Sequence, residues 1–67
     1  MNITIPQLIK LGTVYHHIAY PETQPEYNTS AYWKTKEAFG NWRKISARLR
    51  EFGYTWEPKI RTYRHTL

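Results

Sequence analysis

The sequence predicts a small α+β domain with about three short helices followed by a C-terminal β-hairpin. Its 67 residues leave room for one domain, spanning residues 1–67. Apolar residues recur at helical spacing in residues 5–11 and again in residues 42–52. After Gly53 the pattern changes to the alternating aromatic and β-branched residues that are typical of strands. At 40% hydrophobic and 16% aromatic residues, the chain is too apolar for a disordered tail.

The first helix is predicted over residues 1–12. Thr4 and Gln7 have the spacing of a capping box, and Pro6 suits the first turn. Gly12 is placed to end the helix. The apolar stripe of this helix consists of Ile5, Leu8, Ile9 and Leu11. A short strand over residues 2–5 is the alternative.

Residues 13–29 are expected to be irregular or loop-rich. Their apolar residues suit either a strand or a short helical turn. Pro21 and Pro25 stand among polar residues and predict a loop.

Two further helices are predicted between Ser30 and Phe52. The first, starting near Ser30, reaches about Phe39. Gly40 and Asn41 predict a tight turn, because Asn41 is itself a good N-cap; a continuous helix through Gly40 would cost about 1 kcal/mol. The second helix covers residues 42–52 and is closed by Gly53. Its apolar face consists of Trp42, Ile45, Leu49 and Phe52.

The hairpin is predicted over residues 54–66. Pro58 suits the second position of a type I turn over residues 57–60. This turn would pair Trp56 with Arg61 and allow a cation–π contact between them. The remaining pairs would be Thr55 with Thr62 and Tyr54 with Tyr63.

Charge is concentrated in the second half of the chain. The net charge is +5, and residues 30–67 hold nine Lys and Arg against three Glu. Such asymmetry suits a polyanionic partner. The outward side of helix 42–52 would present cations around a small residue, which lets a helix backbone approach a DNA groove closely. The candidate nucleic-acid-binding residues are Arg43, Lys44, Ala47 and Arg50 on this helix, and Lys59, Arg61 and Arg64 on the hairpin. The competing interpretation is a solvated cationic surface.

The run from Asn41 to Tyr54, together with residues 55–64, resembles the last helix and wing of winged helix-turn-helix DNA-binding domains, as in small modules of phage and plasmid replication proteins. The matching positions are Ile45, Leu49, Gly53, Tyr54, Arg61 and Tyr63. The resemblance implies a winged-helix-like fold in which residues 42–52 form the recognition helix and residues 54–64 the wing. It also implies binding of duplex DNA and a role as a phage or plasmid regulator.

Catalytic and metal chemistry find little support in the sequence. There is no cysteine, which excludes disulfides, thiolate ligands and a cysteine nucleophile. The adjacent His16 and His17 are poor co-ligands, and no Gly-rich phosphate loop or close pair of carboxylates is present. We therefore expect no enzyme activity, no metal, no cofactor and no small-molecule substrate.

No apolar run approaches the roughly 20 residues that a membrane span needs, and no signal-peptide pattern is present. We therefore expect a cytoplasmic protein with no membrane partner. The alternative function is a protein-interaction module or inhibitor that binds a host protein through an aromatic surface; a homodimer and an RNA or single-strand binder also remain open. The aromatic candidates are Tyr15, Tyr20, Tyr27, Tyr32 and Trp33.

Overall fold

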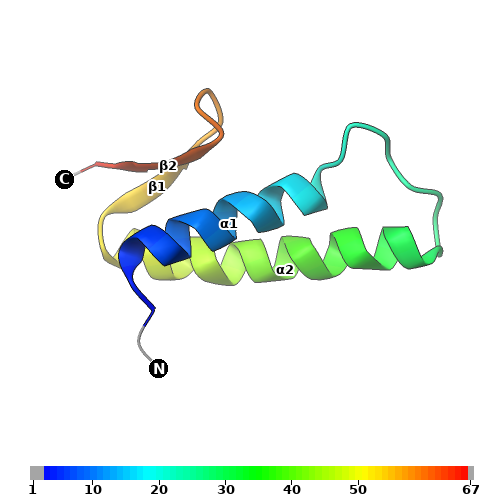
Figure 1. Ribbon diagram of the computed structural model, residues 1–67, viewed down its shortest axis with the longest axis horizontal. Coiled ribbons are helices and arrows are strands. Elements are labelled where there is room, and N and C mark those ends of the chain that lie inside the picture. Colours follow the sequence, from blue (N-terminus) through cyan, green and yellow to red (C-terminus); the bar gives the residue numbers. More distant parts are fainter. Residues whose placement is uncertain (1–2, 67) are drawn as a thin grey trace.

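The computed structural model describes residues 3–66 and shows two helices followed by a two-stranded antiparallel hairpin (Figure 1). The elements are α1 (Ile5–Ala19), α2 (Ser30–Glu51), β1 (Tyr54–Glu57) and β2 (Thr62–His65). The helices run antiparallel, and the hairpin packs back on them, β1 against α2 and β2 against α1. The predicted α+β class is confirmed, but the described part of the chain has two long helices instead of three short ones.

Helix α1 begins at Ile5, directly after the predicted capping residue Thr4, and ends seven residues later than predicted. Residues 1 and 2 of the predicted helix lie outside the described residues. The capping box is confirmed: the Thr4 N–H donates to Gln7 Oε1 at 2.9 Å, and the Gln7 N–H donates to Thr4 Oγ1 at 3.3 Å. The alternative strand over residues 2–5 is wrong in its described part, because Ile5 is already helical. The predicted end at Gly12 is also wrong, since the helix continues to Ala19. The irregular stretch expected over residues 13–29 is therefore limited to residues 20–29, which form the loop that joins the helices.

Gly12 lies inside α1 because Tyr63 of β2 approaches the helix there. A Cβ atom on Gly12 would stand 2.6 Å from both Cε2 and Oη of Tyr63. Tyr63 is itself buried, and its hydroxyl shares a 2.6 Å hydrogen bond with Ser46 Oγ of α2. Gly12 is therefore the point at which the hairpin docks on α1.

Helix α2 runs without a break through Gly40 and Asn41, so the predicted pair of helices is wrong and the continuous helix is correct. Thr29 is the N-cap, and its Oγ1 accepts the Tyr32 N–H at 3.2 Å. Burial of Ala38 just before Gly40, and the packing of Trp42 just after it, offset the cost of one helical glycine. The predicted closure is confirmed, because Gly53 follows the C-cap with a φ of 87°.

The two helical glycines predict opposite effects of the same substitution. No atom lies within 4 Å of a Cβ on Gly40, so Gly40→Ala is expected to raise the free energy of unfolding by about 0.5–1 kcal/mol. Gly12→Ala is expected to lower it by about 1–3 kcal/mol, because the new methyl group overlaps the Tyr63 ring. Urea unfolding of both variants measures the difference. Two changes of the same sign would contradict the docking role of Gly12.

The hairpin is present, but its strands pair two residues away from the predicted register. Trp56 lies opposite Tyr63, and Tyr54 lies opposite His65, so the predicted pair of Trp56 with Arg61 is wrong. The turn after Glu57 does form, but Arg61 follows it in the left-handed region, with a φ of 54°, and stays in the loop. Packing decides this register: the Trp56 and Tyr63 rings meet edge to face with centroids 5.0 Å apart.

The core is thin. Its buried hydrophobic residues are Ala19, Ala38, Leu49 and Tyr63. Leu49 is the only one of the predicted face of helix 42–52 that is fully buried; Phe52 was expected in the core and is instead 47% exposed. Much of the apolar surface of the described residues therefore remains in contact with solvent.

Candidate functional site

The four candidate residues on α2 are all exposed and lie along its outward side. Arg43, Lys44, Ala47 and Arg50 are spaced so that, at about 100° per residue, they occupy the side opposite Leu49. The Arg43 guanidinium carbon lies 5.9 Å from the centroid of the Phe39 ring, one turn earlier. We call these four residues the α2 basic face.

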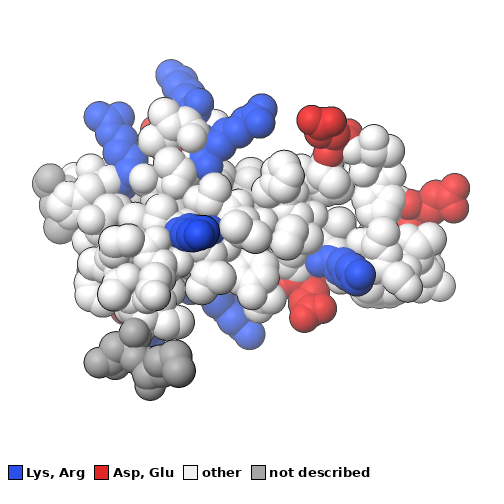
Figure 2. All heavy atoms as spheres, viewed as in Figure 1, with Lys and Arg blue, Asp and Glu red and all other residues white. Residues whose placement is uncertain are grey.

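The hairpin candidates are exposed too, but the structure places them on another part of the molecule. Lys59 and Arg61 lie in the hairpin loop, and Arg64 lies on β2 opposite Thr55. Arg61 lines a groove together with Thr13 and Val14 of α1, and none of the four residues of the α2 basic face lines it. Figure 2 shows Lys and Arg side chains gathered over the hairpin end of the visible face and Glu side chains toward the interhelical loop. The candidate residues therefore come from two elements, α2 and the hairpin.

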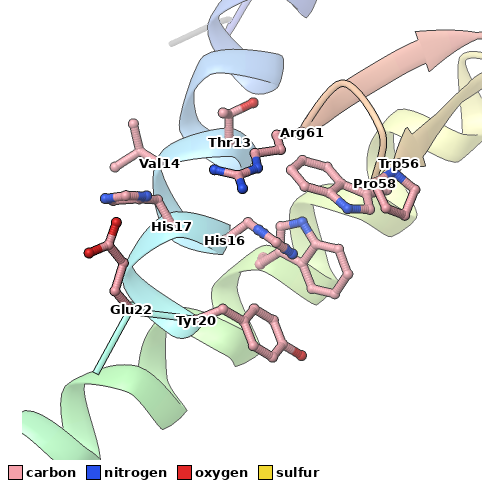
Figure 3. Close-up of a pocket in the computed structure, with 10 residues that line it drawn as sticks. Thr13, Val14, His16, His17, Tyr20, Glu22, Trp56, Pro58 and Arg61 are labelled. Atoms are coloured by element: carbon pink, nitrogen blue, oxygen red, sulfur yellow. The ribbon is translucent and has the colours of Figure 1, made fainter. Parts of the chain in front are cut away.

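Residues of α1, α2 and the hairpin, together with Glu22 of the interhelical loop, line an open groove of about 890 Å³ (Figure 3). We call it the aromatic groove. Its lining residues are Thr13, Val14, His16, His17, Tyr20, Glu22, Trp42, Trp56, Pro58 and Arg61. The His16 ring lies at its centre, with ring centroids 4.2 Å from Trp56, 4.8 Å from Tyr20 and 5.2 Å from Trp42. Arg61 reaches toward α1 from the hairpin, and Glu22 lies past the end of α1.

The surroundings of His16 in this groove lower the pKa of its imidazole. Burial among the rings lowers its pKa from 6.5, and the positive charges of Arg61 and His17 lower it further. The imidazole is therefore neutral at pH 7 and acts as a flat aromatic surface. The sequence alone suggests His16 only as a poor metal ligand. Its position one helical turn before Tyr20 would indicate stacking of the two rings, but only if residues 13–19 are known to be helical.

The lowered pKa of His16 predicts a loss of stability in mild acid. As the pH falls, His16 takes up a proton near pH 6.5 in the unfolded chain, but only at a lower pH in the folded chain. Protonation therefore favours the unfolded state, and the free energy of unfolding that is present above pH 6.5 declines as the pH falls through the folded-state pKa. Unfolding free energies measured between pH 7.5 and pH 5, at intervals of about half a unit, should show this slope. The slope should flatten in His16→Gln and persist in His65→Gln. An unchanged slope in His16→Gln would mean that another group causes the pH dependence of the unfolding free energy.

Beside the groove, Trp42 and Tyr63 form a buried polar contact region. Burial raises the pKa of Tyr63, and this outweighs the opposite effects of the Ser46 hydroxyl and the nearby Trp42 indole. The Trp42 indole nitrogen is buried and forms no hydrogen bond of acceptable geometry within residues 3–66. The hydrogen bond between Ser46 and Tyr63 joins the hairpin to α2.

Among the described residues, no group of three or more His, Cys, Asp or Glu side chains could hold a metal ion. Neither helix in residues 3–66 combines the length and the apolar character that crossing a membrane requires. No protein-family model, curated protein or solved structure matches this chain. The exposed basic residues and the aromatic groove are therefore the features of the molecule that bear on its function.

Proposed function

We propose that this protein is a non-catalytic, winged-helix-like regulator of a phage or plasmid that binds duplex DNA. The observation that carries the proposal is the α2 basic face: three cations exposed around Ala47 on one side of a continuous 22-residue helix. The major groove is about 12 Å wide and admits an α-helix, and a small central residue lets the backbone come close. The opposite side of α2 is fixed by Leu49 and by the hairpin, so the helix would enter the groove as a rigid element.

The basic hairpin residues would act on phosphates and not on bases. Lys59 and Arg61 are exposed on the hairpin loop, and Arg61 lines the aromatic groove beside α1. From the hairpin they would contact phosphates and fix the orientation of the duplex, as contacts with the DNA backbone do. Affinity would therefore come from both basic groups, and base preference from α2 alone.

Removing two cations from the α2 basic face is expected to weaken DNA binding by roughly tenfold or more, since each lost contact costs about 1–3 kcal/mol. The variant is Arg43→Ala with Arg50→Ala, and the readout is fluorescence anisotropy on a random duplex at about 50 and 200 mM salt. Lys10→Ala with Lys34→Ala is the matched control, because it removes the same charge from exposed positions, one on α1 and one about 140° from Ala47 around the axis of α2. Equal losses in the two variants, or binding that does not weaken with salt, would contradict the proposal.

The aromatic groove favours a second candidate, a protein-interaction module. Its volume lies in the range of ligand pockets, and Trp and Tyr side chains dominate the energetics of protein interfaces. A protein partner held there would be lost in Trp56→Ala and retained in the Arg43→Ala, Arg50→Ala variant. A pull-down with and without nuclease separates the two candidates, because nuclease removes only partners that are bridged by nucleic acid. A single-stranded competitor in the anisotropy assay tests for stacking of unpaired bases.

A further inference from the structure

Helix α1 is apolar on both of its sides. Its inner side is covered, because Gly12 meets Tyr63 and Ala19 is buried. On the outer side, Leu11, Val14 and Ile18 remain 39%, 47% and 42% exposed. Lys10 is the only Lys, Arg, Asp or Glu of the helix. An apolar row on a helix normally packs against another element, and the row formed by Leu11, Val14 and Ile18 has no such cover among the described residues.

The exposed residues have the spacing of a helix-pairing seam. Leu11, Val14 and Ile18 follow each other at intervals of three and four residues, which places them in one row along the helix. The same intervals place the a and d residues of a coiled coil against a neighbouring helix. We call these three residues the α1 stripe. Its shape fits another helix better than a flat or extended partner.

The chain exposes more surface than its mass predicts. The accessible surface is 5601 Å². A folded monomer of 8.1 kDa is expected to expose about 4,500 Å². The excess of about 1,100 Å² is distributed over several elements, and the α1 stripe contributes one part of it. A standard interface buries roughly 800 Å² of each partner, so an excess of this size leaves room for one.

A second copy of this chain provides a cover of complementary charge. If two α1 helices pair antiparallel about Val14, Lys10 of each copy approaches the C-terminal end of the other helix, where the helix dipole is negative and Glu22 follows. Parallel pairing would instead place Lys10 against Lys10. The stripe itself carries no charge that would repel a copy.

We propose that this protein forms a homodimer in which the α1 stripes of two copies pack antiparallel. The interface is on α1 and leaves the α2 basic face free. The dimer therefore does not depend on the DNA-binding proposal, although it would present two basic faces to a duplex.

Val14→Glu is expected to dissociate the dimer, raising its dissociation constant at least about tenfold, because each copy would bury a carboxylate at the centre of the interface. Sedimentation equilibrium from about 1 to 500 μM measures it. Ile60→Glu makes a similar change at a 56% exposed residue of the hairpin and should stay dimeric. Circular dichroism checks that both variants are folded. A wild-type monomer over the whole range, or a dimer that Val14→Glu leaves intact, would overturn the proposal.

Cross-linking tests the orientation without depending on a destabilising variant. The chain has no cysteine, so each introduced thiol is unique. Val14→Cys should form a disulfide-linked dimer on mild oxidation, because only residues that face each other across the helix pair come within the Cα distance of about 7 Å that a disulfide requires. Mixed Leu11→Cys and Ile18→Cys should cross-link more than Leu11→Cys alone. Ala47→Cys, exposed on α2, is the control; cross-linking there as efficient as at Val14 would indicate random collision and reject the interface.

Discussion

Replacing Tyr63 with alanine is expected to lower the free energy of unfolding by about 3–5 kcal/mol, the range of large aromatic truncations in a core. Tyr63 is 6% exposed and joins all parts of the fold: its ring meets Gly12 of α1 and Trp56 of β1, and its hydroxyl bonds to Ser46 of α2. A two-stranded hairpin is marginal without packing, so this ring holds it in place. Urea unfolding at pH 7 measures the change, and much of the protein should be unfolded in water, since the core of so small a domain supplies only about 3–5 kcal/mol.

Tyr63→Phe separates the ring from the hydroxyl. It keeps the contacts with Gly12 and Trp56 and removes only the hydrogen bond to Ser46, so a loss of about 1 kcal/mol is expected. If the alanine and phenylalanine variants lost the same amount, the hydroxyl and not the ring would hold the hairpin, and the role given to Gly12 would be wrong.

The features that the sequence predicts correctly are those set within a few residues of each other. The capping box at Thr4 needs only Gln7, and the positive φ of Gly53 needs only the end of a helix before it. Gly12 and Gly40 show where local reasoning fails. The sequence predicts a break at each of them, yet both are helical. At Gly12 the reason is a contact with a residue distant in the chain. Tyr63, which explains Gly12, lies 51 positions later.

The candidate site also has some features that the local sequence predicts and others that depend on distant residues. Arg43, Lys44 and Arg50 lie on the polar side of a helix, and helical periodicity alone predicts that they are exposed. This prediction does not depend on what packs against the apolar side. The aromatic groove needs three elements to meet at His16, so no single segment predicts it. The α1 stripe cannot be predicted while residues 13–19 are expected to be irregular, because Val14 and Ile18 then have no helical positions. Once they are helical, the three-and-four spacing that ends at Ile18 is visible in the sequence itself.

Truncating Leu49 is expected to cost about 2–5 kcal/mol, the second-largest effect in the molecule. Leu49 is 0% exposed and is the only fully buried large side chain among the described residues. It lies in the last turn of α2, three residues before Phe52 and five before β1 begins. Leu49→Ala removes three heavy atoms from a site closed on all sides, so the cavity that remains adds to the lost burial. Denaturant unfolding measures the loss.

Phe52→Ala is the matched control for Leu49→Ala. It removes a larger side chain from the same end of α2, but Phe52 is 47% exposed, so its loss should be less than half as great. If burial governs stability here, the smaller side chain gives the larger effect. The reverse order would mean that Phe52 is covered in solution by something outside this chain, and the end of α2 beside the hairpin would then be a second interface alongside the α1 stripe.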